Sequence, residues 1–264
     1  MQTFDCAIAW EWEPDRAYIQ RLNDACIAKG VSMYLMNPAN IQETISRLER
    51  DQLAFRVYYD RASDNDPRFL PLIHYTKKMK SFLINEYANT LRALDKATMH
   101  LEFLTKGILV PYTVILSPYN SDPGLKITEL EHLGRPFIIK PATGGGGTGV
   151  VVGAETLHDI IEARKQYGSD KYLLQEKVVP MVADNRRSWF RILYCCGSVF
   201  PCWWDERTYI YEMVTDDERA RFKLDPLWRI PQDIADVCRL DFFSTEICLT
   251  TDGRFVTVDY VNDP

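Results

Sequence analysis

The sequence has no long hydrophobic run, few histidines and no excess of basic charge. A run of about 18 apolar residues, the length needed for a membrane-spanning helix, does not occur. The first five residues, Met-Gln-Thr-Phe-Asp, lack the basic and apolar stretches of a secretory signal. Lys and Arg number 31 against 37 Asp and Glu, a net charge of −6, whereas nucleic-acid binders present an electropositive surface. We therefore expect a cytoplasmic protein with neither a nucleic-acid nor a membrane partner.

Cysteine and histidine also lack the spacings of a disulfide framework or a zinc site. The seven cysteines are an odd number without a CxxC pair, and most lie in apolar stretches, as reduced core thiols do. No two of the four histidines are spaced i, i+4. Hydrophobic residues make up 46% and charged residues 26%, which is ordinary for a globular chain. At about 150 residues per domain, 264 residues predict one or two domains.

The first part of the chain alternates strand-like and helix-like segments. Strands are predicted at 4–9, 31–36 and 54–59, with helices at 14–29 and 40–50 between them. This order is typical of a parallel β-α-β-α-β unit with right-handed crossovers. A loop is predicted at 61–71, a helix at 89–106 and a strand at 108–116, before a turn-rich connector at 117–124.

Beyond residue 124 the pattern becomes α+β and antiparallel. Strands are predicted at 136–140, 150–152 and 172–178, with helices at 156–167 and 231–240. One hairpin is predicted at 187–204, turning at Gly197-Ser198, and another pairs 242–249 with 254–261 through Asp252-Gly253. The segment 206–229 is polar and predicted to be irregular, with a helix and a loop. The fold class is thus α/β followed by α+β.

Residues 144–149, Gly-Gly-Gly-Gly-Thr-Gly, lie between two of these predicted strands. The run contains GxGxxG, but a dinucleotide-binding loop leads into a helix, and the valines that follow favour a strand. No Gly-Lys-Ser/Thr follows either, so it is no P-loop. A strand, glycine loop and strand form a flap whose N–H groups can bind phosphates. A flexible surface hairpin is the alternative; because each glycine costs about 0.5–1 kcal/mol of backbone entropy, phosphate binding is favoured.

Four segments, in order and over nearly the whole chain, resemble the motifs of the ATP-grasp superfamily. Asp95-Lys96 before Gly-Ile-Leu-Val-Pro at 107–111 resembles its "DK … GI-x-x-P" segment. Phe-Ile-Ile-Lys-Pro at 137–141 with the glycines resembles its second lysine and flap, and Leu-Leu-Gln-Glu-Lys-Val at 173–178 resembles its adenine-binding hinge strand. Thr-Glu-Ile at 245–247 and Val-Asp-Tyr-Val-Asn at 258–262 resemble its metal-binding hairpin.

The resemblance implies a set of nucleotide-binding residues. Phosphates would be bound from two lysines and the flap, adenine by the hinge, and the ribose by an acidic residue after the hinge. These residues are Lys96, Lys140, Gly144, Gly145, Gly146, Gly147, Thr148, Gln175, Glu176, Lys177, Val178 and Asp184.

Two carboxylates and an amide are predicted to bind Mg²⁺ or Mn²⁺. Glu246 and Asp259 lie on the two strands of one hairpin, so both can point from one face, and Mg²⁺ prefers such hard oxygen ligands. The family usually has Glu-x-Asn, whereas here Asn262 follows Asp259 by three residues, which means opposite faces unless a bulge or turn intervenes. Asp263 is a possible substitute. The alternative is a solvated hairpin with ordinary acids.

Arg191 and Lys140 are the predicted catalytic residues. The segment 189–192, Trp-Phe-Arg-Ile, resembles the family's "D-I-R-V", and its guanidinium can clamp the transferred phosphoryl group or an acyl-phosphate. A surface cation is an equally weighted alternative. The acid that precedes the arginine in the family motif is absent from this segment. Asp184 is then the expected ribose ligand. Ser244 stands where some peptide-ligase branches have a catalytic arginine, so those branches are no close match.

The resemblance implies an ATP-grasp fold in several parts. We expect a pre-ATP-grasp β/α domain at 1–85, a linker helix and strand at 86–120, a lid subdomain at 121–180 and a C-terminal metal-binding part at 181–264. ATP would lie between the lid and the C-terminal part. The chain stops at Pro264, so either this last part is short or a tail that completes the substrate pocket is missing.

The implied activity is an ATP- and Mg²⁺-dependent ligase. It would activate a carboxylate as an acyl-phosphate for attack by an amine or similar nucleophile. The sequence identifies neither substrate. A homodimer is possible. Two alternatives are a small-molecule kinase of the same fold and a non-catalytic ATP-binding module.

Two aromatic segments have two interpretations. Trp-Glu-Trp-Glu at 10–13 and Trp-Trp-Asp-Glu-Arg at 203–207 can form a substrate wall or pack at a domain seam. Packing is the favoured interpretation.

Overall fold

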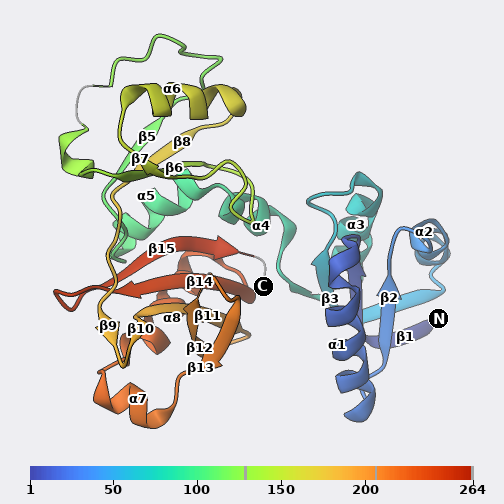
Figure 1. The fold of residues 1–264 in the computed structure, drawn as a ribbon. Helices are drawn as coiled ribbons and strands as arrows, with labels where there is room; N and C mark the ends of the chain where they lie inside the picture. The colour runs from blue at the N-terminus through green and yellow to red at the C-terminus, as the bar shows by residue number, and fades with distance from the viewer. Residues whose placement is uncertain (128–129, 206, 263–264) are drawn as a thin grey trace. The chain divides into compact units, whose positions relative to one another are not determined.

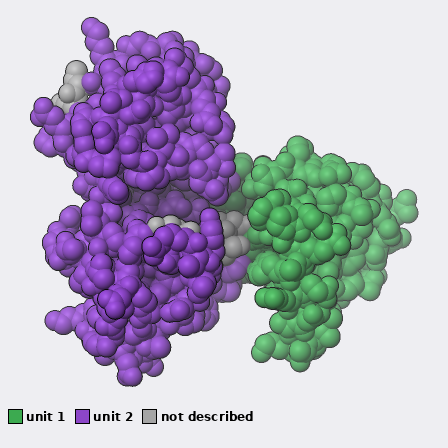
Figure 2. Space-filling view, in the orientation of Figure 1, with its two compact units in different colours: residues 1–91 green, residues 92–264 purple. Residues whose placement is uncertain are grey.

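The computed structural model of this chain describes residues 1–127, 130–205 and 207–262. Contacts divide it into two compact units, residues 1–91 and residues 92–264, which are described separately (Figures 1 and 2). In the described ranges no helix is long and apolar enough to cross a membrane.

The first unit is built on a parallel sheet. Its strand order is β2-β1-β3-β4, and every neighbouring pair is parallel. Apolar side chains of the strands and helices form one buried core. The elements are β1 (Gln2–Trp10), a 3-10 helix (Glu13–Asp15), α1 (Arg16–Ala28), β2 (Met33–Met36), α2 (Ile41–Glu49), β3 (Leu53–Arg61), a 3-10 helix (Pro67–Phe69), α3 (Leu70–Lys78) and β4 (Phe82–Ile84). The predicted β-α-β-α-β unit is confirmed.

Two predictions around this unit need correction. The predicted loop 61–71 contains a 3-10 helix and the start of α3, because Pro67 and Pro71 occupy first-turn positions where a missing N–H is tolerated. The single helix predicted at 89–106 is two helices, α4 (Tyr87–Leu94) and α5 (Lys96–Lys106). The break lies at Asp95, which has extended backbone and accepts hydrogen bonds from the N–H groups of Ala97 and Thr98.

The second unit contains a small antiparallel sheet of order β5-β8-β6-β7. Helix α6 covers its outer face over a core that includes Phe137, Ile160 and Tyr172 (Figure 1). Its elements are β5 (Thr113–Leu116), a 3-10 helix (Glu131–Leu133), β6 (Phe137–Pro141), β7 (Val151–Ala154), α6 (Leu157–Gln166) and β8 (Tyr172–Gln175). The four predicted strands are present, and two of them are shorter than predicted, since 108–112 and 176–178 are not in strands.

The second unit also contains a large antiparallel sheet of order β13-β12-β11-β14-β15. Helix α8 packs on one face, and Leu173 of the small sheet shares a core with Phe243 and Tyr260 of the large one. The elements are the two-stranded hairpin β9 (Val182–Ala183) and β10 (Arg186–Arg187), then β11 (Trp189–Cys195), β12 (Ser198–Asp205), β13 (Ile210–Met213), α7 (Asp216–Arg221), α8 (Pro226–Cys238), β14 (Phe242–Leu249) and β15 (Phe255–Asn262).

The polar segment 206–229 is more regular than predicted. It contains β13, α7 and the start of α8. The helix predicted to begin at Pro231 begins at Pro226, and Pro231 lies buried within it. Two prolines lie in this helix, and the predicted start was placed at the second. The first, Pro226, is the one that occupies the first turn.

The pairing of β14 with β15 contains two register shifts. Ser244 is opposite Asn262, Glu246 is opposite Asp259, and Ile247 is opposite Thr257. The two strands therefore lose register on both sides of the Glu246–Asp259 pair, and β15 contributes an extra residue between Asp259 and Asn262. This bulge decides the geometry of the predicted metal site.

Candidate functional site

A cavity of about 570 Å³ lies between the small and large sheets of the second unit. Figure 2 shows the surface of this unit hollowed between its upper and lower parts. All but one of the residues predicted for nucleotide, metal and catalysis line it: Lys96, Lys140, Gly144, Gly145, Gly146, Gly147, Thr148, Gln175, Glu176, Lys177, Val178, Arg191, Glu246, Asp259 and Asn262. Segments separated by more than 160 residues are thus brought to one place.

The glycine run connects β6 to β7 over this cavity, as the strand, loop and strand prediction required. Gly144, Gly146, Gly147 and Gly149 have positive φ, between 62° and 91°, where other residues are strained. Four bare peptide units in such turns leave their N–H groups accessible to an anion. At Gly149 a Cβ would also lie 2.6 Å from the ring of Tyr167.

Lys96 reaches the glycine loop from the first turn of α5. Its backbone N–H donates to the carbonyl of Ala142 at 2.8 Å, and its Nζ donates to the carbonyl of Gly144. Asp95, the residue before it, caps the helix and also pairs with Lys171 beside the base of the flap. The Asp-Lys pair therefore has two separate roles: the acid fixes the helix start and the lysine faces the loop.

Lys140 is buried at the end of β6, with 7% of its surface exposed. Its Nζ donates to the carbonyl of Val258 at 3.1 Å and lies 5.0 Å from the centre of the Tyr260 ring. Burial lowers the pKa of Lys140; Asp259 and Glu246 act in the opposite direction, and Lys96 acts with burial. The two carboxylates partly offset the cost of burying this ammonium.

A buried hydrogen-bond network lies beneath this lysine. Gln175 Nε2 donates to the Tyr260 hydroxyl at 2.6 Å and to Thr113 Oγ1 at 2.9 Å. The Tyr260 hydroxyl also lies 2.8 Å from His100 Nδ1. With His100 neutral, the hydroxyl can donate to Nδ1 while it accepts from Gln175. The network joins β8, β15 and α5 at the base of the cavity.

The predicted hinge follows β8 at the cavity edge. The N–H of Glu176 donates to the carbonyl of Tyr112 at 2.9 Å, and the carboxylate of Glu176 accepts from the N–H of Tyr112 at 2.8 Å. Lys177 is exposed and Val178 half-buried. These pairings hold an extended segment that connects the small sheet to the large one.

Glu246 and Asp259 are directly opposite each other on β14 and β15. Glu246 accepts from Trp189 Nε1 at 2.9 Å and from Arg191 Nη1 at 3.0 Å. Burial, and then the charge of Asp259, raise the pKa of Glu246, although Trp189, Arg191 and Lys140 act to lower it. Two opposed carboxylates in a buried place repel each other, and a bound cation would relieve this repulsion.

The bulge in β15 returns Asn262 to the side of Asp259. Asn262 Nδ2 donates to Asp259 Oδ2 at 2.7 Å, so the three-residue spacing does not separate them. Asp263, the predicted substitute, lies outside the described residues. Within those residues no group of three His, Cys, Asp or Glu side chains is arranged for a metal ion. Two carboxylates with an amide oxygen are nevertheless the hard donors that suit Mg²⁺ or Mn²⁺.

Arg191 extends from β11 into the cavity beside these acids. It bonds Glu246 and donates from Nε and Nη2 to Ser244 Oγ at 3.2 and 3.0 Å. Ser244 is the residue that was expected to stand where some peptide-ligase branches have an arginine. The guanidinium of Arg191 on β11 lies against this serine, since Ser244 is on the neighbouring strand β14.

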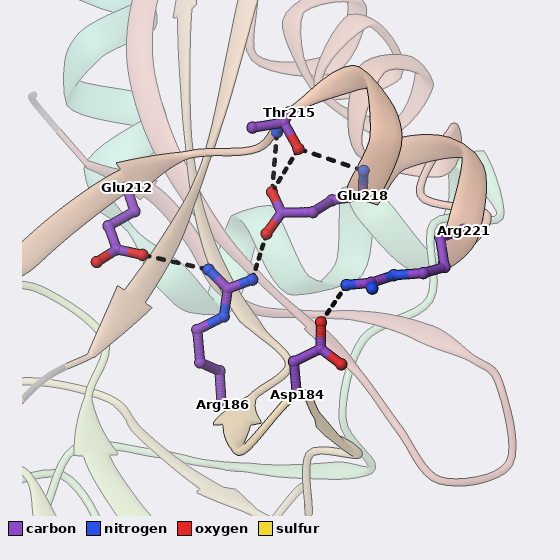
Figure 3. Close-up of polar contacts among 6 residues, drawn as sticks. All are labelled: Asp184, Arg186, Glu212, Thr215, Glu218 and Arg221. Carbon is purple, nitrogen blue, oxygen red and sulfur yellow. Dashed lines mark hydrogen bonds and ion pairs between the residues drawn. The ribbon is translucent and has the colours of Figure 1, made fainter.

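Asp184 is the predicted residue that does not line the cavity. It lies with Asn185 in the turn of the β9–β10 hairpin, both with positive φ, and its carboxylate pairs with Arg221 (Figure 3). Nearby, Arg186 pairs with Glu212 and Glu218 (Figure 3). The role of Asp184 as a ribose ligand stays a prediction. Its observed ion pair with Arg221 holds a surface hairpin against α7.

A second hollow of about 550 Å³ lies on the other side of the glycine loop. Its lining includes Asp170 and otherwise neutral residues. An anionic ligand is disfavoured there because no Lys or Arg is part of that lining, so the cavity with Lys96 and Lys140 is the better phosphate site.

The backbone is similar to several solved structures over almost its entire length. One is a RimK-domain ATP-grasp protein from Sphaerobacter thermophilus, at TM-score 0.66 and 19% identity over 98% of this chain and 90% of that chain. Another is D-alanine–D-alanine ligase from Bacillus anthracis in complex with ATP, at TM-score 0.67 and 11% identity over 98% and 86%. The ATP-grasp ligase PsnB with a minimal precursor, Mg and ADP has a TM-score of 0.64 and 14% identity over 97% and 88%.

The chain has the ATP-grasp fold. At these identities the likeness establishes the fold only. No family model matches the sequence, and no match is found among curated proteins. Mixed α/β architecture is thereby confirmed, and the assignment of roles within the ATP-grasp fold comes from the geometry of this chain's own residues.

Four aromatic and cationic residues of the cavity were not among the predicted site residues. Trp189, Arg187, Trp204 and Tyr209 line it beside Arg191. The sequence offered one signal, the aromatic segment 203–207, for which packing was the favoured interpretation. The alternation of β11 and β12 places Trp189 and Trp204 on the cavity side, which a strand prediction without known pairing does not reveal.

Proposed function

We propose that this protein is an ATP- and Mg²⁺-dependent ligase that activates a carboxylate as an acyl-phosphate for attack by an amine or similar nucleophile. The observation that carries the proposal is the division of one cavity into two walls. Two lysines and a glycine loop form one wall, and two directly opposed carboxylates form the other. Positive charge and N–H donors on one side suit phosphates, and carboxylates on the other suit the metal that accompanies them.

The nucleotide would lie across the cavity with its phosphates under the glycine loop. Lys96 and Lys140 would bind phosphate oxygens, in place of their present bonds to backbone carbonyls. The segment Gln175 to Val178 would contact adenine at the cavity edge. Two of the similar structures contain a nucleotide, one ATP and the other ADP with Mg, which supports nucleotide binding by this fold.

Glu246, Asp259 and Asn262 would hold Mg²⁺ or Mn²⁺, because they are hard oxygen donors on one side of the bulged hairpin. The ion, when bound, neutralises phosphate charge and so favours phosphoryl transfer. Arg191, bonded to Glu246 and Ser244, is placed to stabilise the charge on the transferred group or on the substrate carboxylate.

In the proposed reaction a carboxylate oxygen attacks the γ-phosphorus, and the bond from this phosphorus to ADP breaks. The nucleophile then attacks the acyl carbon, loses a proton, and displaces inorganic phosphate. The chain's contribution is alignment, charge stabilisation and exclusion of water under the loop.

Titration calorimetry with ATP and GTP, each with and without Mg²⁺, tests the nucleotide and metal sites. We expect ATP to bind, and chelation of Mg²⁺ to weaken binding at least tenfold. Lys140→Ala and Glu246→Ala should each weaken Mg–ATP binding by about tenfold or more, since each removes a charged hydrogen-bonding group. Lys165→Ala, which removes an exposed lysine paired with Glu162, is the matched control.

Folding of every variant is checked by thermal unfolding. Unchanged ATP affinity in folded Lys140→Ala and Glu246→Ala proteins would show that the nucleotide site is misplaced. Product analysis then separates the activities: phosphate beside ADP, dependent on an amine, supports the ligase. A phosphorylated product contradicts it in favour of a kinase, and Mg–ATP binding without ADP across acid and amine panels contradicts it in favour of a binding module.

A further inference from the structure

The cavity-facing side of the large sheet changes character from one edge to the other. Cross-strand pairing places Asp259, Glu246, Arg191, Cys202 and Met213 in one row, from β15 to β13. Directly opposed residues share a face. The row is therefore acidic at the predicted metal site, cationic at its centre, and apolar toward the edge strand.

Residues two positions along each strand continue the apolar end of this face. Trp204 pairs with Tyr211 across β12 and β13, and their rings stack with centroids 4.6 Å apart at 27°. The Tyr209 ring is T-shaped to the same indole, with ring centroids 5.7 Å apart. We call Trp204, Tyr209, Tyr211 and Met213 the aromatic platform.

The platform is exposed on the cavity side although it is apolar. Tyr209 is 74% exposed, Met213 55% and Tyr211 49%, whereas Trp204 beneath them is 8% exposed. Contiguous exposed apolar surface next to a polar site is typical of ligand contact. Because α8 packs on the opposite face of the sheet, the platform is not needed to close that core.

The platform is continuous with the reactive end of the cavity. Trp204 and Tyr209 line the cavity, and the Arg191 guanidinium lies 5.9 Å from the Trp204 ring centre. Burial raises the pKa of Tyr211, while Arg191 lowers it and Glu246 raises it, so this phenol lies within electrostatic reach of the site. Arg187, which also lines the cavity, adds a second guanidinium over the Trp189 ring at 5.4 Å.

We propose that the aromatic platform binds the organic part of the acid substrate, and that this substrate is a carboxylic acid with an aromatic or other planar apolar group. The guanidinium of Arg191 then faces the acid's carboxylate while the rings of Tyr209, Tyr211 and Trp204 contact its apolar group. Charge complementarity and continuity with the nucleotide cavity select this occupant over a neutral apolar molecule or a polar diacid. The inference rests on the proposed function, because it names the acid that the ATP site would phosphorylate.

Binding of three small probes to the full-length protein tests the platform. The probes are 3-phenylpropionate, glutarate and 3-phenylpropanamide, measured by ligand-observed NMR with saturating Mg²⁺ and ADP. We expect 3-phenylpropionate to bind about tenfold more tightly than either other probe, since only it has both the ring and the single carboxylate. Equal binding of the three, or no binding of 3-phenylpropionate up to about 10 mM, would overturn the inference.

Two variants separate the platform from general effects on the sheet. Tyr211→Ser should weaken 3-phenylpropionate binding by about tenfold and leave Mg–ADP affinity unchanged. Phe200→Ser is the matched control, because Phe200 is an exposed ring, 42% exposed, on strand β12 of the same sheet but not part of the aromatic platform. Equal losses in the two variants, or a loss of ADP affinity without a change in acid preference, would contradict the platform.

The two proposals fail in different ways. Absence of Mg–ADP binding contradicts the proposed function, and the preference of the protein alone for 3-phenylpropionate can still be measured. Tight Mg–ADP binding without a preference among the acids contradicts the platform and leaves the nucleotide site standing. If Tyr211→Ser does not fold, the comparison of the three probes on the parent protein decides the question.

Discussion

At the scale of single residues, the site gathers several buried charges of both signs in one cavity. Glu246 faces Asp259 across the hairpin, and burial with this neighbour raises its pKa. Lys140 is buried near both acids, with a lowered pKa. Such perturbed groups gathered in one cavity are typical of functional sites, because a ligand must complete their charge balance.

His100 makes the protein's stability sensitive to acid. Burial, and then the charge of Lys140, lower its pKa from 6.5 to about 4. The unfolded chain takes up this proton below about 6.5, and the folded protein only below about 4. The stabilisation is therefore complete above pH 6.5 and is lost as pH falls toward 4, by roughly 3 kcal/mol in total.

We expect His100→Asn to remove this acid dependence. Urea unfolding between pH 7 and 4 should show that the parent loses roughly 3 kcal/mol more than the variant over this interval. His158→Asn, which replaces an exposed histidine on α6, should follow the parent. The assignment is wrong if His100→Asn and the parent lose equal stability.

At the scale of elements, the glycine loop and the bulged hairpin determine the site. The loop depends on backbone conformations that other residues avoid, and its glycines differ in this respect. Gly147 has φ of 74°, whereas Gly145 does not have positive φ, and neither has an atom within 4 Å of an added Cβ. The two positions therefore form a matched pair for a test of backbone conformation without a steric clash.

Gly147→Ala should weaken ATP binding, and Gly145→Ala should not. The left-handed conformation costs alanine about 1–2 kcal/mol, which corresponds to about five- to thirtyfold in affinity if the loop keeps this shape around phosphates. Calorimetry with Mg–ATP measures both variants. Equal affinities would mean that the observed loop conformation is not the one that binds ATP.

The sequence revealed the motifs within single strands and helices, but it did not reveal how the strands pair. The helix predicted at 89–106 ends where expected, before Gly107, which has positive φ, whereas the break at Asp95 within it was not predicted. The spacing from Asp259 to Asn262 left two outcomes open, because a bulge depends on the register with β14 rather than on β15 alone. The predicted loop at 61–71 and the predicted helix start at Pro231 were both wrong. Both segments contain prolines, and the effect of a proline depends on its position within a helix turn.

At the scale of the whole molecule, the cavity belongs to one of the two units. All its lining residues lie within 92–264, and that unit has its own cores. Helix α4 is fixed to it through Arg92, which pairs with Glu102 and donates to the carbonyls of Val237 and Cys238. Glu86 accepts hydrogen bonds from the N–H groups that begin α4, so a fragment should include it.

A fragment of residues 86–264 should fold by itself and bind Mg–ADP. Because the lining residues and the α4 cap are retained, we expect cooperative thermal unfolding and an affinity within about threefold of the full chain. Calorimetry on both proteins measures this. An unfolded fragment would show that residues 1–85 are needed for folding, and a folded fragment with more than about tenfold lower affinity would show that they contribute to binding.

Most of the strand and helix order, the flap and the identity of most cavity residues follow from local signals in the sequence, namely helix caps, glycine runs and β-branched segments. Only the tertiary structure decided which side chains meet. Strand pairing opposed Glu246 to Asp259, returned Asn262 through a bulge, and kept Asp184 in a surface turn. It also placed Trp204 beside Arg191, since the face of a strand depends on its register with neighbours far away in the chain.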